Sequence, residues 1–184
     1  MLGTSLRSFI AGLFIGLAAS IYLKVGGIVG SLLFTVGLIG VIVCKADLFT
    51  GKLGFIKIRH EYKVLYPFYP LTILTFNALG ILIASWIWGG DATSIVETRL
   101  STPLINIFWN AIGCGILMSI AVISSKRSLI GVLLCVPAFI LAGFPHCIAD
   151  MYYYALDGRI SWAWLLTVIG NWVGCVIPAL IYKK

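Results

Sequence analysis

The chain has 184 residues, of which 61% are hydrophobic and only 10% are charged, and its mean hydropathy is +1.08. Soluble domains carry about 25% charged residues, so this composition indicates an all-α integral membrane protein. A spanning helix takes about 20 apolar residues, which leaves no room for a separate soluble catalytic domain. The net charge of +7 comes from basic residues at the ends of apolar runs, so orientation in a bilayer explains it better than a nucleic-acid partner.

Two of the predicted spanning helices run directly into polar sequences that contain glycine or proline, at 45–52 and 143–150. Non-helical backbone at membrane depth is tolerated only where protein buries it or a cavity wets it. We therefore predict that the second and fifth spans are broken. The apolar run after Arg7 is expected to be the first span rather than a cleaved signal peptide. The six predicted spans lie at about 6–24, 29–48, 67–88, 103–124, 128–143 and 162–182.

Lysine and arginine residues gather on one side of the predicted membrane. The sparsely charged side has only Lys24, Arg99 and Arg159, and the positive-inside rule then predicts that both termini are cytoplasmic. The basic side carries Arg7, Lys52, Lys57, Arg59, Lys63, Lys126, Arg127, Lys183 and Lys184. Aromatic residues expected to act as interfacial anchors are Tyr152, Tyr153, Tyr154, Trp86, Trp88, Trp162 and Trp164.

An N-x-x-G sequence follows each break, at 77–80 and at 171–174. Three spans per half is an odd number, so the second half must enter the membrane upside down. The sequence therefore predicts a single transmembrane domain, residues 1–184, built from two inverted three-helix repeats at about 1–90 and 100–184. The glycines of these sequences, Gly80 and Gly174, would let helices approach closely.

His146 is the candidate for chemistry, because it lies at the second break, beside Pro145. An ionisable group inside a membrane marks a functional site, and a histidine can donate a proton or a hydrogen bond to a small anion and respond to pH. A metal site formed by His146, Cys147 and Asp150 is an alternative, but three ligands within five residues and no second cluster are weak evidence for zinc. We expect no metal and no cofactor.

The two breaks resemble those of a known family. Asp47-Leu48-Phe49-Thr50-Gly51 resembles the loop that breaks the second helix in the formate/nitrite transporter family, and 143–151, Gly-Phe-Pro-His-Cys-Ile-Ala-Asp-Met, resembles its break in the fifth. The resemblance extends over 9–20 and both N-x-x-G sequences. It implies an aquaporin-like six-helix protomer, a homopentamer in a prokaryotic cytoplasmic membrane, and one pore per protomer for small monovalent anions such as formate, nitrite or hydrosulfide.

The resemblance also implies roles for individual residues. The loop threonine and the histidine of the family meet in the pore, which maps onto Thr50 and His146, with Leu48 and Phe49 in the same loop. Independently of the resemblance, the basic side chains expected from their charge and position to attract anions weakly are Lys45, Arg99 and Arg159. The apolar constrictions map onto Phe34, Leu38 and Phe139.

The spacing of Phe34 and Leu38 independently places them on one helix face. Four positions depart from the family pattern: Pro145 replaces a glutamate before the histidine, Gly115 a fourth-span asparagine and Asp150 a fifth-span asparagine, and Lys45 precedes the first break. The chain is also short for the family, so we expect no amino-terminal gating segment.

These observations predict a channel or transporter and no enzyme activity. Removing the water from an anion in an apolar constriction costs much free energy, whereas removing it from a neutral acid costs much less. We therefore expect His146 and Thr50 to protonate or hydrogen-bond the anion, helped by backbone N–H groups at the two broken helices. A channel for small neutral solutes, a membrane-embedded metalloprotein and an assembly protein without flux remain as alternatives.

Overall fold

The structure is a computed structural model and describes residues 2–54 and 68–182. All regular secondary structure in this part of the chain is helical. The basic residues at 57, 59, 63, 183 and 184, used above to predict orientation, lie outside the described residues. The helices are α1 (Leu2–Val25), α2 (Gly27–Val43), α3 (Phe49–Leu53), α4 (Phe68–Trp88), α5 (Thr93–Ser101), α6 (Leu104–Ser124), α7 (Ile130–Leu141), α8 (Cys147–Asp157) and α9 (Ala163–Ile181).

Each of the six predicted apolar segments forms a helix. By length and composition, α1, α4, α6 and α9 are able to cross a membrane. The other two are shorter, with 17 residues in α2 and 12 in α7. At 1.5 Å per residue these helices are about 26 Å and about 18 Å long, less than the hydrocarbon core of about 30 Å. The chain therefore leaves its helical path at both predicted breaks.

The helices before the two breaks end in the same way. Lys45 has a φ of 52° and Gly143 a φ of 70°, both in the left-handed region. The next backbone N–H then donates to a carbonyl five residues back, from Ala46 to Val41 and from Phe144 to Phe139, at 2.9 Å in both cases. This turn ends α2 at Val43, so the expectation that the helix continues to about residue 48 is wrong.

Three short helices were not predicted. α3 and α8 follow the two breaks, and α5 lies in the connection between α4 and α6. The three consecutive tyrosines of α8, 152–154, have exposed fractions of 0%, 6% and 6%, because this helix packs against α1 and α4. The expectation that these tyrosines anchor the protein at the membrane interface is therefore wrong. Trp86 and Trp162 are exposed, as interfacial anchors would be.

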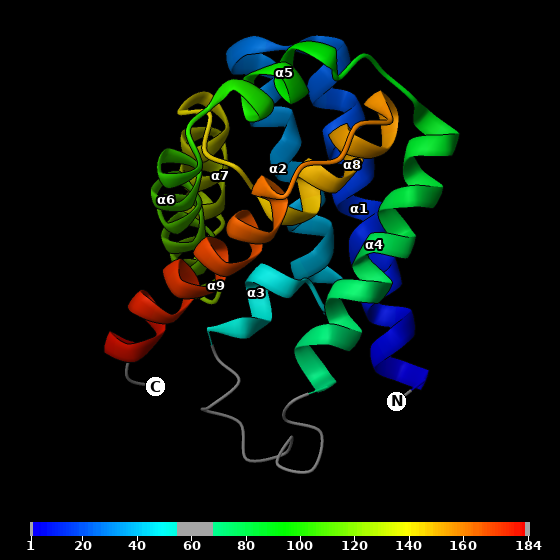
Figure 1. The fold of residues 1–184 in the computed structure, drawn as a ribbon. Helices are drawn as coiled ribbons and strands as arrows, with labels where there is room; N and C mark the ends of the chain where they lie inside the picture. The colour runs from blue at the N-terminus through cyan, green and yellow to red at the C-terminus, as the bar shows by residue number, and fades with distance from the viewer. Residues whose placement is uncertain (1, 55–67, 183–184) are drawn as a thin grey trace.

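The two halves of the chain are interlocked. α1 packs on α4 and α6 packs on α9, while α2 and α7 contact each other between these pairs. Each short helix after a break then reaches into the opposite half, since α3 contacts α6 and α9 and α8 contacts α4 and α1. The start of α1 and the end of α9 lie at one end of the bundle, and α5 lies at the other (Figure 1).

Glycines bring the backbones of the paired long helices together. A Cβ at Gly12 would collide with the Asn77 carbonyl, and a Cβ at Gly80 with the Phe9 carbonyl. A Cβ at Gly174 would likewise collide with the Ile112 carbonyl of α6. The expectation that Gly80 and Gly174 permit close approach is confirmed.

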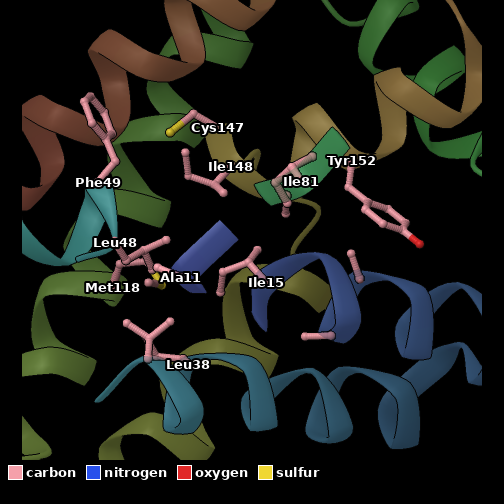
Figure 2. Close-up of a cluster of buried hydrophobic side chains, with 14 of the residues drawn as sticks. Ala11, Ile15, Leu38, Leu48, Phe49, Ile81, Met118, Cys147, Ile148 and Tyr152 are labelled. Carbon is pink, nitrogen blue, oxygen red and sulfur yellow. The ribbon is translucent and has the colours of Figure 1, made fainter. Parts of the chain in front are cut away.

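Apolar side chains from both halves meet in one core. Figure 2 shows Leu38 of α2, Leu48 of the first break and Ile148 of α8 among the buried side chains, with exposed fractions of 1%, 1% and 0%. Residues 46–50 and 145–150 of the two breaks are thus enclosed by protein, which is the condition for irregular backbone at membrane depth.

Candidate pore site

Two asparagines anchor the backbone at the breaks. Asn77 of α4 accepts a hydrogen bond from the Phe49 N–H at 2.9 Å and donates to the Asp47 carbonyl at 3.0 Å. Asn171 of α9 does the same at the second break, accepting from the Cys147 N–H at 2.8 Å and donating to the Pro145 carbonyl at 3.0 Å. The repeated N-x-x-G sequences pointed to these asparagines, but the pattern did not predict what they bind.

His146 is the residue that caps α8. Its Nδ1 accepts a hydrogen bond from the Ala149 N–H at 3.2 Å, and its Nε2 lies 3.0 Å from the Thr50 Oγ1. Since Nδ1 is an acceptor, a neutral ring carries its hydrogen on Nε2 and donates it to the threonine hydroxyl. The predicted meeting of Thr50 and His146 is therefore present, and the two side chains join the breaks to each other.

Both partners of this contact are enclosed, with exposed fractions of 1% for Thr50 and 2% for His146. The Cys175 thiol of α9 donates to the Thr50 carbonyl at 3.0 Å, which ties α3 to the second half of the chain. Sequence reasoning missed this role, because a cysteine in an apolar run resembles an ordinary packing residue.

Aromatic rings cover the histidine on one side. Phe139 stacks on His146 with ring centroids 5.7 Å apart, and Phe34 meets Phe139 edge to face at 6.3 Å. Phe34 comes from α2 and Phe139 from α7, the two helices that end at the breaks. Leu38 is buried on α2, one turn beyond Phe34.

A cavity of about 180 Å³ leads from α5 to these rings. We call it the α5 cavity, because Ile95, Thr98 and Arg99 of that helix form one of its walls. His146 lines it, whereas Thr50, Leu48, Phe49 and Leu38 do not. The other lining residues are Tyr22, Phe34, Phe139, Ile140, Gly143, Phe144, Ala149, Asp150 and Tyr153.

Two of the three basic side chains expected to attract anions are already paired. The Nε of Arg99 lies 3.1 Å from the Asp150 carboxylate, and its Nη1 donates to the Gly143 carbonyl at 2.8 Å. Arg159 pairs with Asp157 through Nη2 at 2.9 Å. Lys45 is exposed and lies two residues beyond the C-terminal end of α2, at the first break. The pairing of Arg99 with Asp150 spans 51 residues, so no local pattern in the sequence could have revealed it.

A second buried carboxylate lies at the first break. Asp47 has an exposed fraction of 2%, and its Oδ1 is 2.8 Å from the Lys52 Nζ. The Arg7 Nε approaches Oδ2 at 3.2 Å as an ion pair, without the alignment of a hydrogen bond. The two breaks therefore each hold an aspartate with basic partners.

Backbone N–H groups at the start of α8 have acceptors within the protein. Those of Cys147 and Ala149 donate to Asn171 and to the His146 ring, and that of Asp150 donates to the His146 carbonyl at 2.8 Å. The expectation that helix ends present such groups to an anion is therefore not met by these three donors.

The departures from the family pattern have structural consequences. A Cβ at Gly115 would collide with the Asn171 carbonyl, so the close contact of α6 with α9 leaves no room for an asparagine there. Asp150 faces Arg99 rather than His146 and Cys147. Within residues 2–54 and 68–182, no three His, Cys, Asp or Glu side chains lie in a group able to hold a metal ion.

Known proteins are similar to this chain in sequence and in fold. The sequence model described as formate/nitrite transporter matches residues 1–183. The nitrite transporter NirC of Escherichia coli is 28% identical in an alignment that covers 92% of this chain and 75% of the relative.

Solved structures resemble the chain along almost its whole length. A structure described as a pentameric formate channel with formate bound matches with a TM-score of 0.76 and 21% identity, covering 98% of this chain and 93% of the other. A second, described as an FNT family ion channel, gives 0.79 and 23%, covering 98% and 89%. With its two broken helices and the family match over residues 1–183, the chain belongs to the formate/nitrite transporter family of membrane proteins.

Proposed function

We propose that the protein is a membrane channel for small monovalent weak acids such as formic acid, nitrous acid or hydrogen sulfide and their anions. The observation that carries this proposal is the 3.0 Å contact between Thr50 Oγ1 and His146 Nε2, behind the aromatic rings of Phe34 and Phe139. This contact provides polar hydrogens at a point where apolar side chains would otherwise exclude an ion.

The hydrogen-bond directions give the two residues different tasks. A neutral His146 donates from Nε2 to the Thr50 hydroxyl, since its Nδ1 is occupied by the Ala149 N–H. Among the described residues no acceptor for the Thr50 hydroxyl hydrogen is present, so Thr50 can donate it to an arriving anion. The histidine lines the α5 cavity and orients the hydroxyl, and an anion meets Thr50 only beyond that cavity.

Protonation lowers the cost of crossing the constriction. A bare anion between Phe34 and Phe139 would lose its water without gaining a charged partner, at a cost of many kcal/mol. Removing the water from a neutral acid at the same point costs far less free energy. The channel therefore conducts the acid form past the rings. His146 and Thr50 hydrogen-bond the anion until it takes up a proton from the acidic external solution.

The architecture we propose for this function is two inverted three-helix repeats in an aquaporin-like arrangement within a single transmembrane domain. Its support is the matching pair of anchors, Asn77 and Asn171, and the exchange of α3 and α8 between the two halves. The homopentamer is supported by the structural relative, which is described as pentameric.

Orientation in a prokaryotic cytoplasmic membrane, with both termini inside, is part of the same proposal. The start of α1 and the end of α9 lie at one end of the bundle (Figure 1). The basic residues Arg7 and Lys52 belong to that end, since both contact Asp47 at the first break. The α5 cavity then opens to the outside.

The test is flux into proteoliposomes at an acidic and a neutral external pH. Formate, nitrite, hydrosulfide, acetate and lactate are compared with water and glycerol, for the intact protein and for His146→Asn. Acid-stimulated uptake that is lost in a folded, assembled variant supports the proposal. Flux of neutral solutes alone, without pH dependence, would assign the pore to neutral solutes instead. Equal weak-acid flux in both proteins would remove His146 from the mechanism.

A further inference from the structure

The α5 cavity contains one cation and one carboxylate besides His146. Among the described residues that line it, these are Arg99 and Asp150, and the remaining residues are apolar, tyrosine, threonine or glycine. The side chains are 13% exposed for Arg99 and 2% for Asp150. An anion that enters this cavity therefore meets a salt bridge rather than a free positive charge.

The geometry of the salt bridge uses the whole guanidinium group. Its Nε donates to Asp150 Oδ2 at 3.1 Å, its Nη2 lies 3.5 Å from Oδ1, and its Nη1 donates to the Gly143 carbonyl at 2.8 Å. Two guanidinium nitrogens thus face the two carboxylate oxygens, the side-by-side arrangement of a bidentate arginine–carboxylate pair. The contact with Gly143 holds Arg99 at the cavity wall even without the carboxylate.

We infer that Asp150 is a specificity-determining residue of the α5 cavity, where it neutralises Arg99 and thereby weakens the binding of anions. The inference rests on the proposed function and adds that the cavity admits the substrate as the neutral acid rather than as the anion. A free guanidinium in a partly enclosed cavity attracts anions strongly and releases them slowly, because screening by water and salt is weak there. The paired guanidinium leaves a neutral, polar cavity that admits the acid form and holds anions only briefly.

A structural role alone would make a different prediction. The salt bridge also ties α5 to the second break, because Arg99 bridges both Gly143 and Asp150. Asp150→Asn separates the two roles, because the amide has the same shape and its oxygen can still accept from Nε. This variant keeps the tie and changes the charge of the pair from zero to +1.

The experiment measures uptake of formate and nitrite from the α5 face, with orientation determined by protease access to a tag at the C-terminus. In Asp150→Asn, the half-saturating concentration is expected to fall about tenfold, as for one unpaired charge about 10 Å from the anion at an effective dielectric constant of about 20. The maximal rate should fall as well, because a tightly held anion leaves slowly. Asp157→Asn is the matched control. Asp157 lies on α8 like Asp150 and is paired with an arginine, Arg159, but it lies outside the cavity.

Two further variants test charge against shape. In the double variant Arg99→Gln with Asp150→Asn the pair is neutral again, and the half-saturating concentration should return to that of the unmodified protein. Arg99→Gln alone leaves an unpaired carboxylate and should raise the half-saturating concentration. If Asp150→Asn behaves like Asp157→Asn, or if the double variant behaves like Asp150→Asn, the inference is wrong. An unmodified protein without weak-acid flux would instead overturn the proposed function itself, and this inference with it.

Discussion

Thr50 and His146 are 96 residues apart in sequence and share one hydrogen bond, Oγ1 to Nε2, at 3.0 Å. Each lies at one of the two chain breaks, so this bond joins the halves of the molecule where both helices are interrupted. Both nitrogens of the imidazole are engaged, by the Ala149 N–H and by Thr50. In the proposed function the hydroxyl of Thr50 therefore donates to the anion, at a point deeper than the α5 cavity, which His146 lines and Thr50 does not.

The first prediction concerns this hydroxyl. Thr50→Val keeps the shape of the side chain and removes its hydrogen-bonding atom. Weak-acid flux in proteoliposomes should fall about tenfold or more, the effect of losing one hydrogen bond worth about 1–3 kcal/mol at the barrier. Thr50→Ser retains the hydroxyl and should keep most of the flux. Thr72→Val is a matched control, since Thr72 lies on an exposed face of α4 and bonds only the Phe68 carbonyl. Full flux in Thr50→Val would contradict the assignment.

The second prediction concerns the anchors of the breaks. Asn171→Ala removes three buried hydrogen bonds, those with the Cys147 N–H and the carbonyls of Pro145 and Ala111. Each group left unsatisfied costs about 1–3 kcal/mol, so the melting temperature in detergent should fall strongly.

Asn77→Ala should destabilise the protein by a similar amount, because it loses the equivalent contacts at the first break and one with the Ser8 carbonyl. Asn106→Ala, at an exposed position of α6, serves as the control. Unequal losses, with one anchor variant as stable as the control, would mean that the two breaks are not held in equivalent ways.

The elements that could be predicted from the sequence are those with a local signal. Runs of apolar residues predicted the six long helices, and a left-handed residue after α2 explains why that helix ends earlier than expected. α5 and α8 lack a continuous apolar run and were missed. The tyrosines of α8 are buried only because the helix is enclosed by α1 and α4, a tertiary fact that residue type does not carry.

The site shows the same division. The resemblance of the two breaks to the family implied that Thr50 and His146 would meet, and the spacing of Phe34 and Leu38 placed both on one face of α2. Arg99, by contrast, was expected to attract anions because it lies on the sparsely charged side of the predicted membrane. The carboxylate that pairs with it comes from α8, so only the folded chain brings the two charges together.

The third prediction concerns the close contact of α6 with α9. Gly115→Ala places a methyl group against the Asn171 carbonyl, and Gly115→Asn adds a larger group at the same point. Overpacking of this kind costs about 1–3 kcal/mol for small additions, so both variants should lower the melting temperature, the asparagine more than the alanine.

Gly51→Ala provides the comparison, because its added Cβ would meet Val122 Cγ2 at 3.6 Å and Leu48 Cβ at 3.8 Å, which are ordinary contacts. It should be neutral or slightly stabilising, since alanine favours helix over glycine by about 1 kcal/mol. A Gly115→Asn protein as stable as Gly51→Ala would show that α6 and α9 can separate without cost.

The last prediction concerns the aromatic constriction. Phe34 meets Phe139 edge to face at a centroid distance of 6.3 Å, and both rings line the α5 cavity in front of His146. Phe34→Ala removes one wall of this constriction. Lactate and glycerol, which are larger than formate, should then cross faster, and water permeability should rise. Phe14→Ala is the control for the loss of a ring, because Phe14 of α1 packs against Gly40 of α2 and does not line the cavity. If Phe34→Ala still excluded lactate and glycerol while remaining folded, the step that selects by size would have to lie deeper, at Leu38 and Leu48, where the buried core closes around the first break.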